Sequence, residues 1–415
     1  MTHPETFIWI VSLAAIGLLL VRPRSISEAY WACGGALLLI ATRLISLRTA
    51  VHAVSEGRDV YLFLAGMMIL AELARENGVF EWLADVAARH AQQSSWRLFA
   101  LIYLVGAIVT AFLSNDATAV VLTPAILAVV RRAKVKPMPY LLACAFIANA
   151  ASFVFPISNP ANLVVFDGRV PALGAWMKVF ALPAVASVTA TFVCLGWMSR
   201  SELRNAFSES VESIRLSKQG KLALTGLLAA AVVLIVSSAL GLSLGLPTCV
   251  AALLATGLVA WSDGGIVPRI ARGISWSVLP LVAGLFVIVE ALEGAGLRKL
   301  GVSGFERLAQ LSGAAAKIAA GLPVAILSNA MNNLPVALMS GAAVRHAQES
   351  NVLAHALLVG VDLGPNLSVT GSLATILWLI ALRREGVAIT AWDFFKIGIV
   401  AMPVALIASL LFLWS

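Results

Sequence analysis

Apolar residues run through this chain in long blocks separated by short polar segments. A helix needs ~20 apolar residues to cross the ~30 Å hydrocarbon layer of a membrane, and most of the blocks reach or approach that length. The blocks cover residues 7–21, 29–47, 60–75, 98–130, 138–166, 175–199, 221–240, 244–261, 275–293, 313–344, 352–382 and 394–414. This pattern predicts an all-α polytopic membrane protein whose first block is retained as a membrane span.

The same order of motifs occurs twice along the chain. Leu64-Ala65-Gly66 in the first half matches Val282-Ala283-Gly284 in the second, and Ser114-Asn115 matches Ser328-Asn329. Ordered matches at a nearly constant spacing over most of a chain indicate an internal repeat. We therefore expect two halves that descend from one ancestral unit.

Two of the blocks decide how the halves are oriented. If residues 98–130 and 313–344 enter the membrane and return as re-entrant hairpins, broken at the Ser-Asn pairs, each half has five spans and the second half is inverted. This predicts about ten spanning helices, two re-entrant hairpins and two broken helices. If the hairpins cross fully instead, the halves are parallel with twelve spans. The expected division is an N-terminal repeat over residues 1–199, a cytoplasmic linker over 200–220 and a C-terminal repeat over 221–415.

Basic residues are concentrated in short polar segments rather than in a separate domain. The formal net charge is +8, and the Lys and Arg residues of 131–136 and 199–221 indicate cytoplasmic loops by the positive-inside rule. This placement argues against nucleic-acid binding. The four cysteines lie inside apolar blocks and form no CxxC pair, so we expect no disulfide framework, no metal site and no other cofactor.

Four places interrupt the apolar blocks with polar residues and helix breakers. Broken helices in hydrocarbon are tolerated only where their freed backbone groups line a cavity or are buried in protein, and repeat-related breaks indicate one site near the bilayer midplane. Independent kinks healed by Ser and Asn side chains are the alternative. The breaks, with the segment before the second of them, supply the candidate substrate-binding residues Ser114, Asn115, Thr118, Asn149, Ser158, Asn159, Asn162, Ser328, Asn329, Asn332, Asn333, Thr370 and Ser372.

Two acids stand at these breaks, one from each half. Asp116 follows Ser114-Asn115, and Asp362 precedes Gly364-Pro365. A carboxylate at the centre of a spanning helix costs about 2.5–3.5 kcal/mol, most of which protonation removes. We therefore predict that Asp116 and Asp362 couple transport to protons; a structural hydrogen bond or a helix cap is the simpler alternative.

Motifs of nucleotide hydrolases and of hydrolytic enzymes do not occur in the sequence. The segment 217–221 lacks the leading glycine and the Ser/Thr of a Walker A motif, and no HExxH or GxSxG is present. We interpret the chain as a transporter and not an enzyme. A passive pore lined by asparagines and carbonyls is the alternative from another class, which inverted halves around a midplane site disfavour.

Several motifs at the breaks are similar to those of one known family. They are Leu113-Ser114-Asn115-Asp116, Asn332-Asn333-Leu334-Pro335, Val361-Asp362-Leu363-Gly364-Pro365, and Gly371-Ser372-Leu373-Ala374-Thr375 with Trp378. The chain resembles, over nearly its full length, the arsenical pump membrane proteins. That family exports arsenite and antimonite and belongs to the ion transporter superfamily, alongside sodium-coupled dicarboxylate carriers. The resemblance implies that Ser114, Asn115, Ser328 and Asn329 lie at hairpin tips around the substrate.

The resemblance implies a transporter of the bacterial inner membrane that exports arsenite and antimonite. The two acids and the inverted halves add the prediction that export is in exchange for protons by alternating access. Arsenite at neutral pH is the uncharged trihydroxide As(OH)3, whose donors and acceptors match Asn, Ser and Thr side chains. A dianion would be repelled by Asp116 and Asp362, and no Lys or Arg is expected near the breaks to offset this repulsion.

Other members of the superfamily leave alternatives open. These alternatives are a sodium-coupled anion symporter and a sodium–proton antiporter, and a passive metalloid channel is a further one. The family resemblance also implies that a soluble arsenite-stimulated ATPase is a candidate partner. The basic segment 199–221 is where it would dock.

Overall fold

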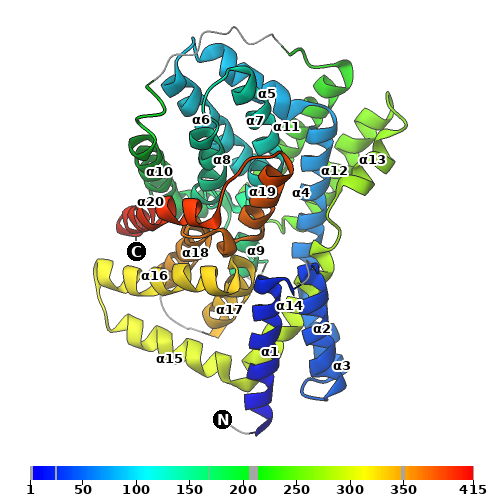
Figure 1. The fold of residues 1–415 in the computed structure, drawn as a ribbon. Coiled ribbons are helices and arrows are strands. Elements are labelled where there is room, and N and C mark those ends of the chain that lie inside the picture. The colour runs from blue at the N-terminus through cyan, green and yellow to red at the C-terminus, as the bar shows by residue number, and fades with distance from the viewer. Residues whose placement is uncertain (1–2, 24–25, 167, 205–213, 347–350, 415) are drawn as a thin grey trace.

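A computed structural model of the chain describes residues 3–23, 26–166, 168–204, 214–346 and 351–414 (Figure 1). The described residues form helices joined by turns, without a strand. The helices of the first half are α1 (His3–Val21), α2 (Glu28–Ala41), α3 (Leu47–Glu56), α4 (Arg58–Glu76), α5 (Val79–His90), α6 (Ser95–Leu113), η2 (Ala117–Leu122), α7 (Thr123–Arg132), α8 (Met138–Ala150), η3 (Pro156–Ser158), α9 (Pro160–Val165) and α10 (Leu173–Met198). Those of the second half are α11 (Lys218–Ala239), α12 (Gly245–Ala260), α13 (Ile266–Gly273), α14 (Val278–Leu292), η4 (Glu293–Leu297), α15 (Arg298–Ala309), α16 (Gly313–Met331), α17 (Asn333–His346), α18 (Asn351–Leu363), η5 (Gly364–Asn366), η6 (Val369–Gly371), α19 (Leu373–Arg384) and α20 (Ala391–Leu411).

The helices confirm the predicted class, an all-α polytopic membrane protein. Within the described ranges, seven helical segments are long and apolar enough to cross a membrane, and shorter apolar helices accompany them. The predicted spans correspond to α1, α2, α4, α8 with α9, and α10 in the first half, and to α11, α12, α14, α18 with α19, and α20 in the second. Of the linker predicted over 200–220, residues 205–213 lie outside the described residues, and α11 begins already at Lys218.

The first predicted hairpin is present, and a hydrogen bond across it shows that the chain reverses. Ser114 ends α6 with φ 118°, a conformation outside the helical region. Beyond this break, Thr118 Oγ1 lies 3.4 Å from the carbonyl oxygen of Gly106. Along a continuous helix, twelve residues would separate these positions by about 18 Å. The chain therefore turns at Ser114, and η2 runs back beside α6 and leads into α7, which packs on α5 and α8.

The second hairpin is also present, but its break lies elsewhere than predicted. Helix α16 continues through Ser328 and Asn329 and ends only at Met331. Asn332, with φ 70°, makes the turn, and α17 then packs against α16. Asparagine tolerates the left-handed region better than other residues with side chains. The prediction of a break at the Ser-Asn pair is therefore right for the first hairpin and wrong for the second.

The two halves exchange packing partners. Helix α4 of the first half lies against α12 of the second, while α14 of the second lies against α2 of the first. The same exchange occurs at the centre, where η2 contacts α19, and α17 contacts α9. Each hairpin thus lies against the broken helix of the other half, so that residues of both halves meet in one place.

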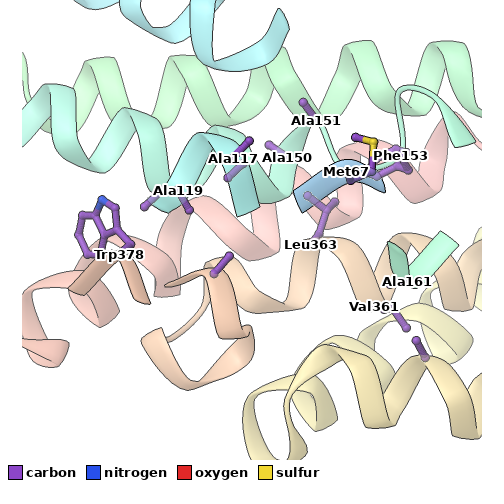
Figure 2. Packing of buried hydrophobic residues seen from close by; sticks show 14 of the residues in the cluster. Met67, Ala117, Ala119, Ala150, Ala151, Phe153, Ala161, Val361, Leu363 and Trp378 are labelled. Carbon is purple, nitrogen blue, oxygen red and sulfur yellow. The ribbon is translucent and has the colours of Figure 1, made fainter. Parts of the chain in front are cut away.

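Small buried side chains let these central segments approach one another closely. Ala117 of the first hairpin and Ala150 and Ala151 at the end of α8 are buried, as is Ala161 of α9 (Figure 2). Small residues at helix contacts are typical of membrane proteins, because they let backbones come close. The polar atoms of the broken segments are therefore held near one another by packing as well as by hydrogen bonds.

Candidate transport site

A central cavity of about 50 Å³ lies where the two hairpin tips and the two broken helices meet. This volume has room for a few water-sized molecules. Its polar lining comes from both halves: Glu28, Asn115, Asp116, Asn159, Asn332, Asn333 and Ser372. Its apolar wall includes Leu19, Leu64, Val278, Leu281 and Leu285. The cavity joins amides, a hydroxyl and two acids within an otherwise apolar enclosure.

A second, larger cavity, which we call the vestibule, has a volume of about 210 Å³. It runs between the first hairpin, α4 and the segment after α13, and its polar lining includes Glu72, Arg75, Ser114, Asp116 and Ser275. Asp116 lines both the vestibule and the central cavity. This carboxylate therefore stands between the two spaces.

Asp116 is positioned by backbone contacts at the hairpin tip. Its N–H donates to Asn115 Oδ1 at 2.9 Å, and the Ser114 hydroxyl accepts a long hydrogen bond from the N–H of Ala117. In the described part of the chain, the Asp116 carboxylate makes no side-chain hydrogen bond or ion pair of its own. A carboxylate without a protein partner, facing two cavities, is free to bind a proton or a solute.

Asp362 lies deeper than Asp116 and reaches the cavity only through a neighbour. It is fully buried, and its Oδ1 accepts a hydrogen bond of 2.7 Å from Asn159 Nδ2. Its other carboxylate oxygen has no hydrogen-bond partner among the described residues. Asn159 itself lines the central cavity and caps α9 through its other amide atom. This single asparagine therefore connects the acid of one half to the cavity and the broken helix of the other.

Several predicted site residues hold the breaks together instead of lining either cavity. Asn162 donates to three backbone carbonyls of the segment before α9, and Ser158 donates to the carbonyl of Ala111 in the first hairpin. Thr118 bonds the hydroxyl of Thr110 across that hairpin. These side chains satisfy backbone groups that the breaks leave without helical partners, as a broken helix in hydrocarbon requires.

The corresponding residues of the second half have a similar structural role. Asn329 donates to the carbonyl of Gly364 at 2.9 Å and accepts from the N–H and the hydroxyl of Ser368. Thr370 donates to the Asn329 carbonyl, and Ser328 donates within its own helix. None of these three predicted residues, Ser328, Asn329 and Thr370, is among the residues that line the two cavities.

Asn149 also lies away from both cavities. Its Nδ2 donates to Asn366 Oδ1 at 3.0 Å, and Asn366 in turn donates to the carbonyl of Phe146. All three are buried. The contact ties α8 of the first half to the break after α18 in the second, which fixes the two broken helices relative to one another.

The fold adds charged residues to the site that the sequence analysis did not include. Glu28, in the first turn of α2, lines the central cavity, and Arg22 lies 2.9 Å from it. Arg75 lines the vestibule. The expectation that no basic residue lies near the breaks is therefore wrong, because the fold brings Arg22 and Arg75 to the cavities beside them. Glu28 and Arg22 border a short polar segment between two spans, so the sequence pattern alone assigns them to a loop.

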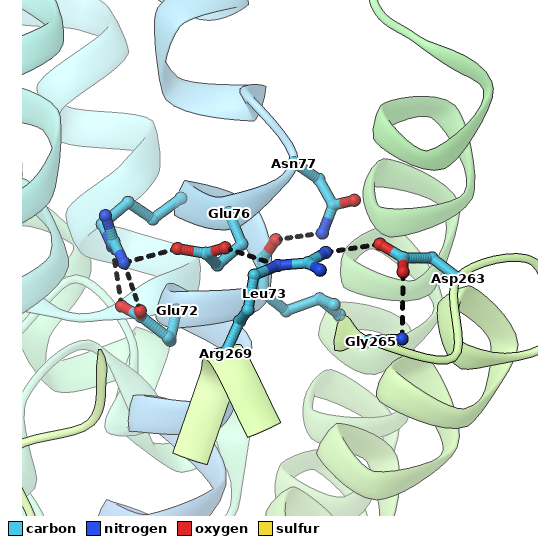
Figure 3. Close-up of polar contacts among 8 residues, drawn as sticks. Glu72, Leu73, Glu76, Asn77, Asp263, Gly265 and Arg269 are labelled. Atoms are coloured by element: carbon cyan, nitrogen blue, oxygen red, sulfur yellow. Dashed lines mark hydrogen bonds and ion pairs between the residues drawn. The ribbon is translucent and has the colours of Figure 1, made fainter. Parts of the chain in front are cut away.

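A chain of ion pairs extends from the vestibule residues Glu72 and Arg75 (Figure 3). Arg75 donates to Glu72 at 2.9 Å and to Glu76 at 2.6 Å, and Glu76 accepts from Arg269 at 3.0 Å. Arg269 also pairs with Asp263, and this hydrogen bond lowers the pKa of the Asp263 carboxyl. The pairs connect the end of α4 to α13 and to the turn before it.

Gly273, at the end of α13, also lines the vestibule. A Cβ atom at this position would overlap the buried carboxylate of Glu72. Because only glycine leaves this space, the side chain of Glu72 can lie under the end of α13 while it faces the vestibule.

The comparison with known families decides where this architecture belongs. The sequence model of the CitMHS family, described as citrate transporter, matches residues 7–360. The chain belongs to this family. Among curated relatives of this CitMHS protein, an arsenical pump membrane protein of Escherichia coli is 26% identical over 407 residues, which cover 95% of each chain. One of Yersinia enterocolitica is 29% identical over 354 residues, or 81% of this chain and 82% of that protein.

These relatives confirm the resemblance to the arsenical pump membrane proteins. Among solved structures, the YdaH transporter of Alcanivorax borkumensis matches with a TM-score of 0.59 at 14% identity, over 99% of this chain and 98% of that one. At this identity the match supports the fold alone. This CitMHS protein is a multi-pass membrane transporter of the bacterial inner membrane, and not an enzyme.

Proposed function

We propose that this transporter exports arsenite and antimonite in exchange for protons by alternating access. The observation that carries the proposal is the position of Asp116, which lines both cavities without a side-chain partner among the described residues. A carboxylate between a midplane cavity and a vestibule can meet protons in one space and solute in the other. Asp362, one hydrogen bond from the cavity through Asn159, is proposed as a second proton-coupling acid.

The polar groups of the central cavity suit a small neutral trihydroxide. Asn115, Asn159, Asn332, Asn333 and Ser372 offer both donors and acceptors. Each of the three hydroxyl groups of As(OH)3 can donate one hydrogen bond and accept others. The relatives named arsenical pump membrane proteins support metalloids as the substrate class.

The driving force of one proton is sufficient for useful export. When one proton enters as one neutral solute leaves, one charge crosses the membrane, which is worth ~2.3 kcal/mol per 100 mV. At about 150 mV this approaches 3.5 kcal/mol, or roughly a few-hundred-fold gradient at 1.4 kcal/mol per decade. The proposal therefore needs no ATPase, and a soluble ATPase docked on segment 199–221 stays a prediction.

Alternating access rests on the proposed inverted relation of the halves. The exchanged packing of α4 with α12 and of α14 with α2 supports it. The vestibule opens toward the end of α4 and the segment after α13, which the positive-inside rule assigns to the cytoplasm. We propose that the described conformation faces inward.

A sodium-coupled anion symporter is the second candidate function, favoured by the description of the family as citrate transporter. Uptake into everted membrane vesicles separates the two. The proposal predicts arsenite accumulation driven by an acidic vesicle lumen, abolished by an uncoupler and independent of sodium. Sodium-dependent citrate uptake without arsenite accumulation would contradict it, and arsenite equilibration without accumulation would indicate a passive channel.

A further inference from the structure

We infer that Glu28 is a specificity-determining residue that excludes anions, because it neutralises Arg22 beside the central cavity. The inference deepens the proposed function and rests on it for the uncharged substrate. It adds a residue pair that lies outside both hairpins and both broken helices, on the α1 and α2 side of the cavity.

The geometry of the pair shows a partly buried cation next to the transport site. Glu28 is only 6% exposed and lines the central cavity together with Asp116. Arg22 Nε lies 2.9 Å from Glu28 Oε1, with side-chain exposures of 21% and 8%. The two atoms lack the alignment of a hydrogen bond, so their attraction is mainly coulombic.

Arg22 also has a backbone conformation that few arginines adopt. Its φ is 48°, in the left-handed region, which a residue with a side chain adopts only where the surroundings impose it. The break after α1 thereby brings the guanidinium group back to the start of α2. The pair is thus a consequence of how the chain leaves the first span.

Removal of one partner from such a pair leaves an uncompensated charge. Without the Glu28 carboxylate, Arg22 would present its planar guanidinium group beside the cavity, and that group binds carboxylates with two parallel hydrogen bonds. With Glu28 and Asp116 both ionised, these three groups carry a net charge of −1, which repels anions. With Glu28 neutral, the net charge is zero, or +1 when Asp116 is protonated.

Arg75 gives a comparison within the same molecule. It lines the vestibule, yet Glu72 and Glu76 both bind it. Arg75 lines the vestibule, and Arg22 contacts Glu28 of the central cavity. Each of these two arginines is therefore paired with a glutamate. A site built for an anionic substrate would leave such a group free to bind it.

Acetate binding to the purified full-length protein tests the inference, because this small carboxylate matches the size of the central cavity. Glu28→Gln should lower the acetate dissociation constant by about tenfold or more, because a hydrogen bond to a charged group contributes that much affinity. The double variant Arg22→Gln/Glu28→Gln should return the constant to the wild-type value. Glu385→Gln is the matched control: it removes the carboxylate beside Arg131, which is 49% exposed and lines neither cavity, and should leave acetate binding unchanged.

The inference is overturned if E28Q binds acetate no better than E385Q, or if the double variant binds it as tightly as E28Q. Thermal unfolding without acetate shows whether each variant is folded, and Glu28→Ser, which frees the same arginine, replaces E28Q if that variant does not fold. The assay contains neither arsenite nor a proton gradient. Failure here therefore leaves the proposed function intact, and failure of arsenite transport leaves the anion result interpretable.

Discussion

Ser114 has a backbone conformation that favours glycine, with φ 118° and ψ 159°. Residues in such sparsely populated regions store about 1–3 kcal/mol of strain, and they cluster at functional sites. Here the strain produces the turn that places Asp116 between the two cavities. The side chain of Ser114 also lines the vestibule, which gives a reason for a serine at a position where glycine would be less strained.

Replacement of Ser114 by glycine should therefore stabilise the protein while it impairs transport. We expect Ser114→Gly to raise the unfolding temperature in detergent, by an amount corresponding to roughly 1 kcal/mol. Ser372→Gly is the control, because Ser372 has ordinary extended dihedral angles and its hydroxyl caps α19. That variant should be slightly destabilised. Equal losses of stability in both variants would show that Ser114 is not strained.

The Asn159–Asp362 contact makes a second prediction at this scale. Asn159→Ala removes the hydrogen bond to a buried carboxyl group and should lower the free energy of unfolding by about 1–3 kcal/mol. A double-mutant cycle with Asp362→Ala measures the coupling by chemical denaturation. Two residues in direct contact should give a non-additive result, and strict additivity would contradict a stabilising role for this bond.

Only some of the residues that the sequence suggests for the site lie at a cavity. Asn115, Asp116 and Asn159 line the central cavity, because a polar residue beside a break in hydrocarbon seldom lies anywhere else. Ser328 and Asn329 do not, since a Ser-Asn pair can also continue a helix when its side chains bond to backbone carbonyls. Glu28 could not be predicted, because it reaches the cavity through the packing of α2 and not through a break.

Among the helices, the hydrophobic pattern predicted the membrane spans but not the short helices between them. Helices α3, α5, α13 and α15 contain charged and polar residues on one face, so they appear in the sequence as polar gaps between apolar blocks. Two of them matter for the site. Helix α13 borders the vestibule at Gly273 and is tied to α4 by an ion pair, and α5 packs against the return arm of the first hairpin.

The packing of α13 on α4 predicts the effect of a single methyl group. Gly273→Ala places a Cβ atom where the Glu72 carboxylate lies, and overpacking of this kind costs about 1–3 kcal/mol. We expect a lower unfolding temperature and slower arsenite uptake into everted vesicles. Gly264→Ala is the matched control, because a Cβ atom there has no neighbour within 4 Å. If both variants unfold at the wild-type temperature and take up arsenite at the wild-type rate, the position of Glu72 beneath α13 is not required for stability or transport.

At the scale of the whole molecule, the proposed inverted repeat predicts that equivalent positions lie on opposite sides of the membrane. Gln92 follows α5, and Gln310 follows α15 at the repeat-related position; both are exposed. In a variant without the four native cysteines, Gln92→Cys should react with a membrane-impermeant maleimide only from the cytoplasmic face, and Gln310→Cys only from the periplasmic face. Reaction of both from one face would indicate parallel halves.

The sequence supported the global architecture more fully than the site, for a physical reason. Span length, loop charge and helix breakers act locally or along one segment, so they are visible in order along the chain. The exchanged packing of α4 with α12 and of α14 with α2 depends on contacts between residues about two hundred positions apart. A single sequence contains no direct record of such pairings.

Asp116 is proposed to couple solute export to protons, and a comparison of three proteins in vesicles tests this role. Arsenite uptake into everted vesicles with an acidic lumen is measured for the wild type, for Asp116→Asn and for the remote control Glu385→Gln, with thermal unfolding as a check of folding. We predict that D116N is folded yet accumulates arsenite no better than vesicles without the protein, while E385Q accumulates it as the wild type does. Uptake by folded D116N equal to that of the wild type would show that Asp116 is not the proton-coupling residue.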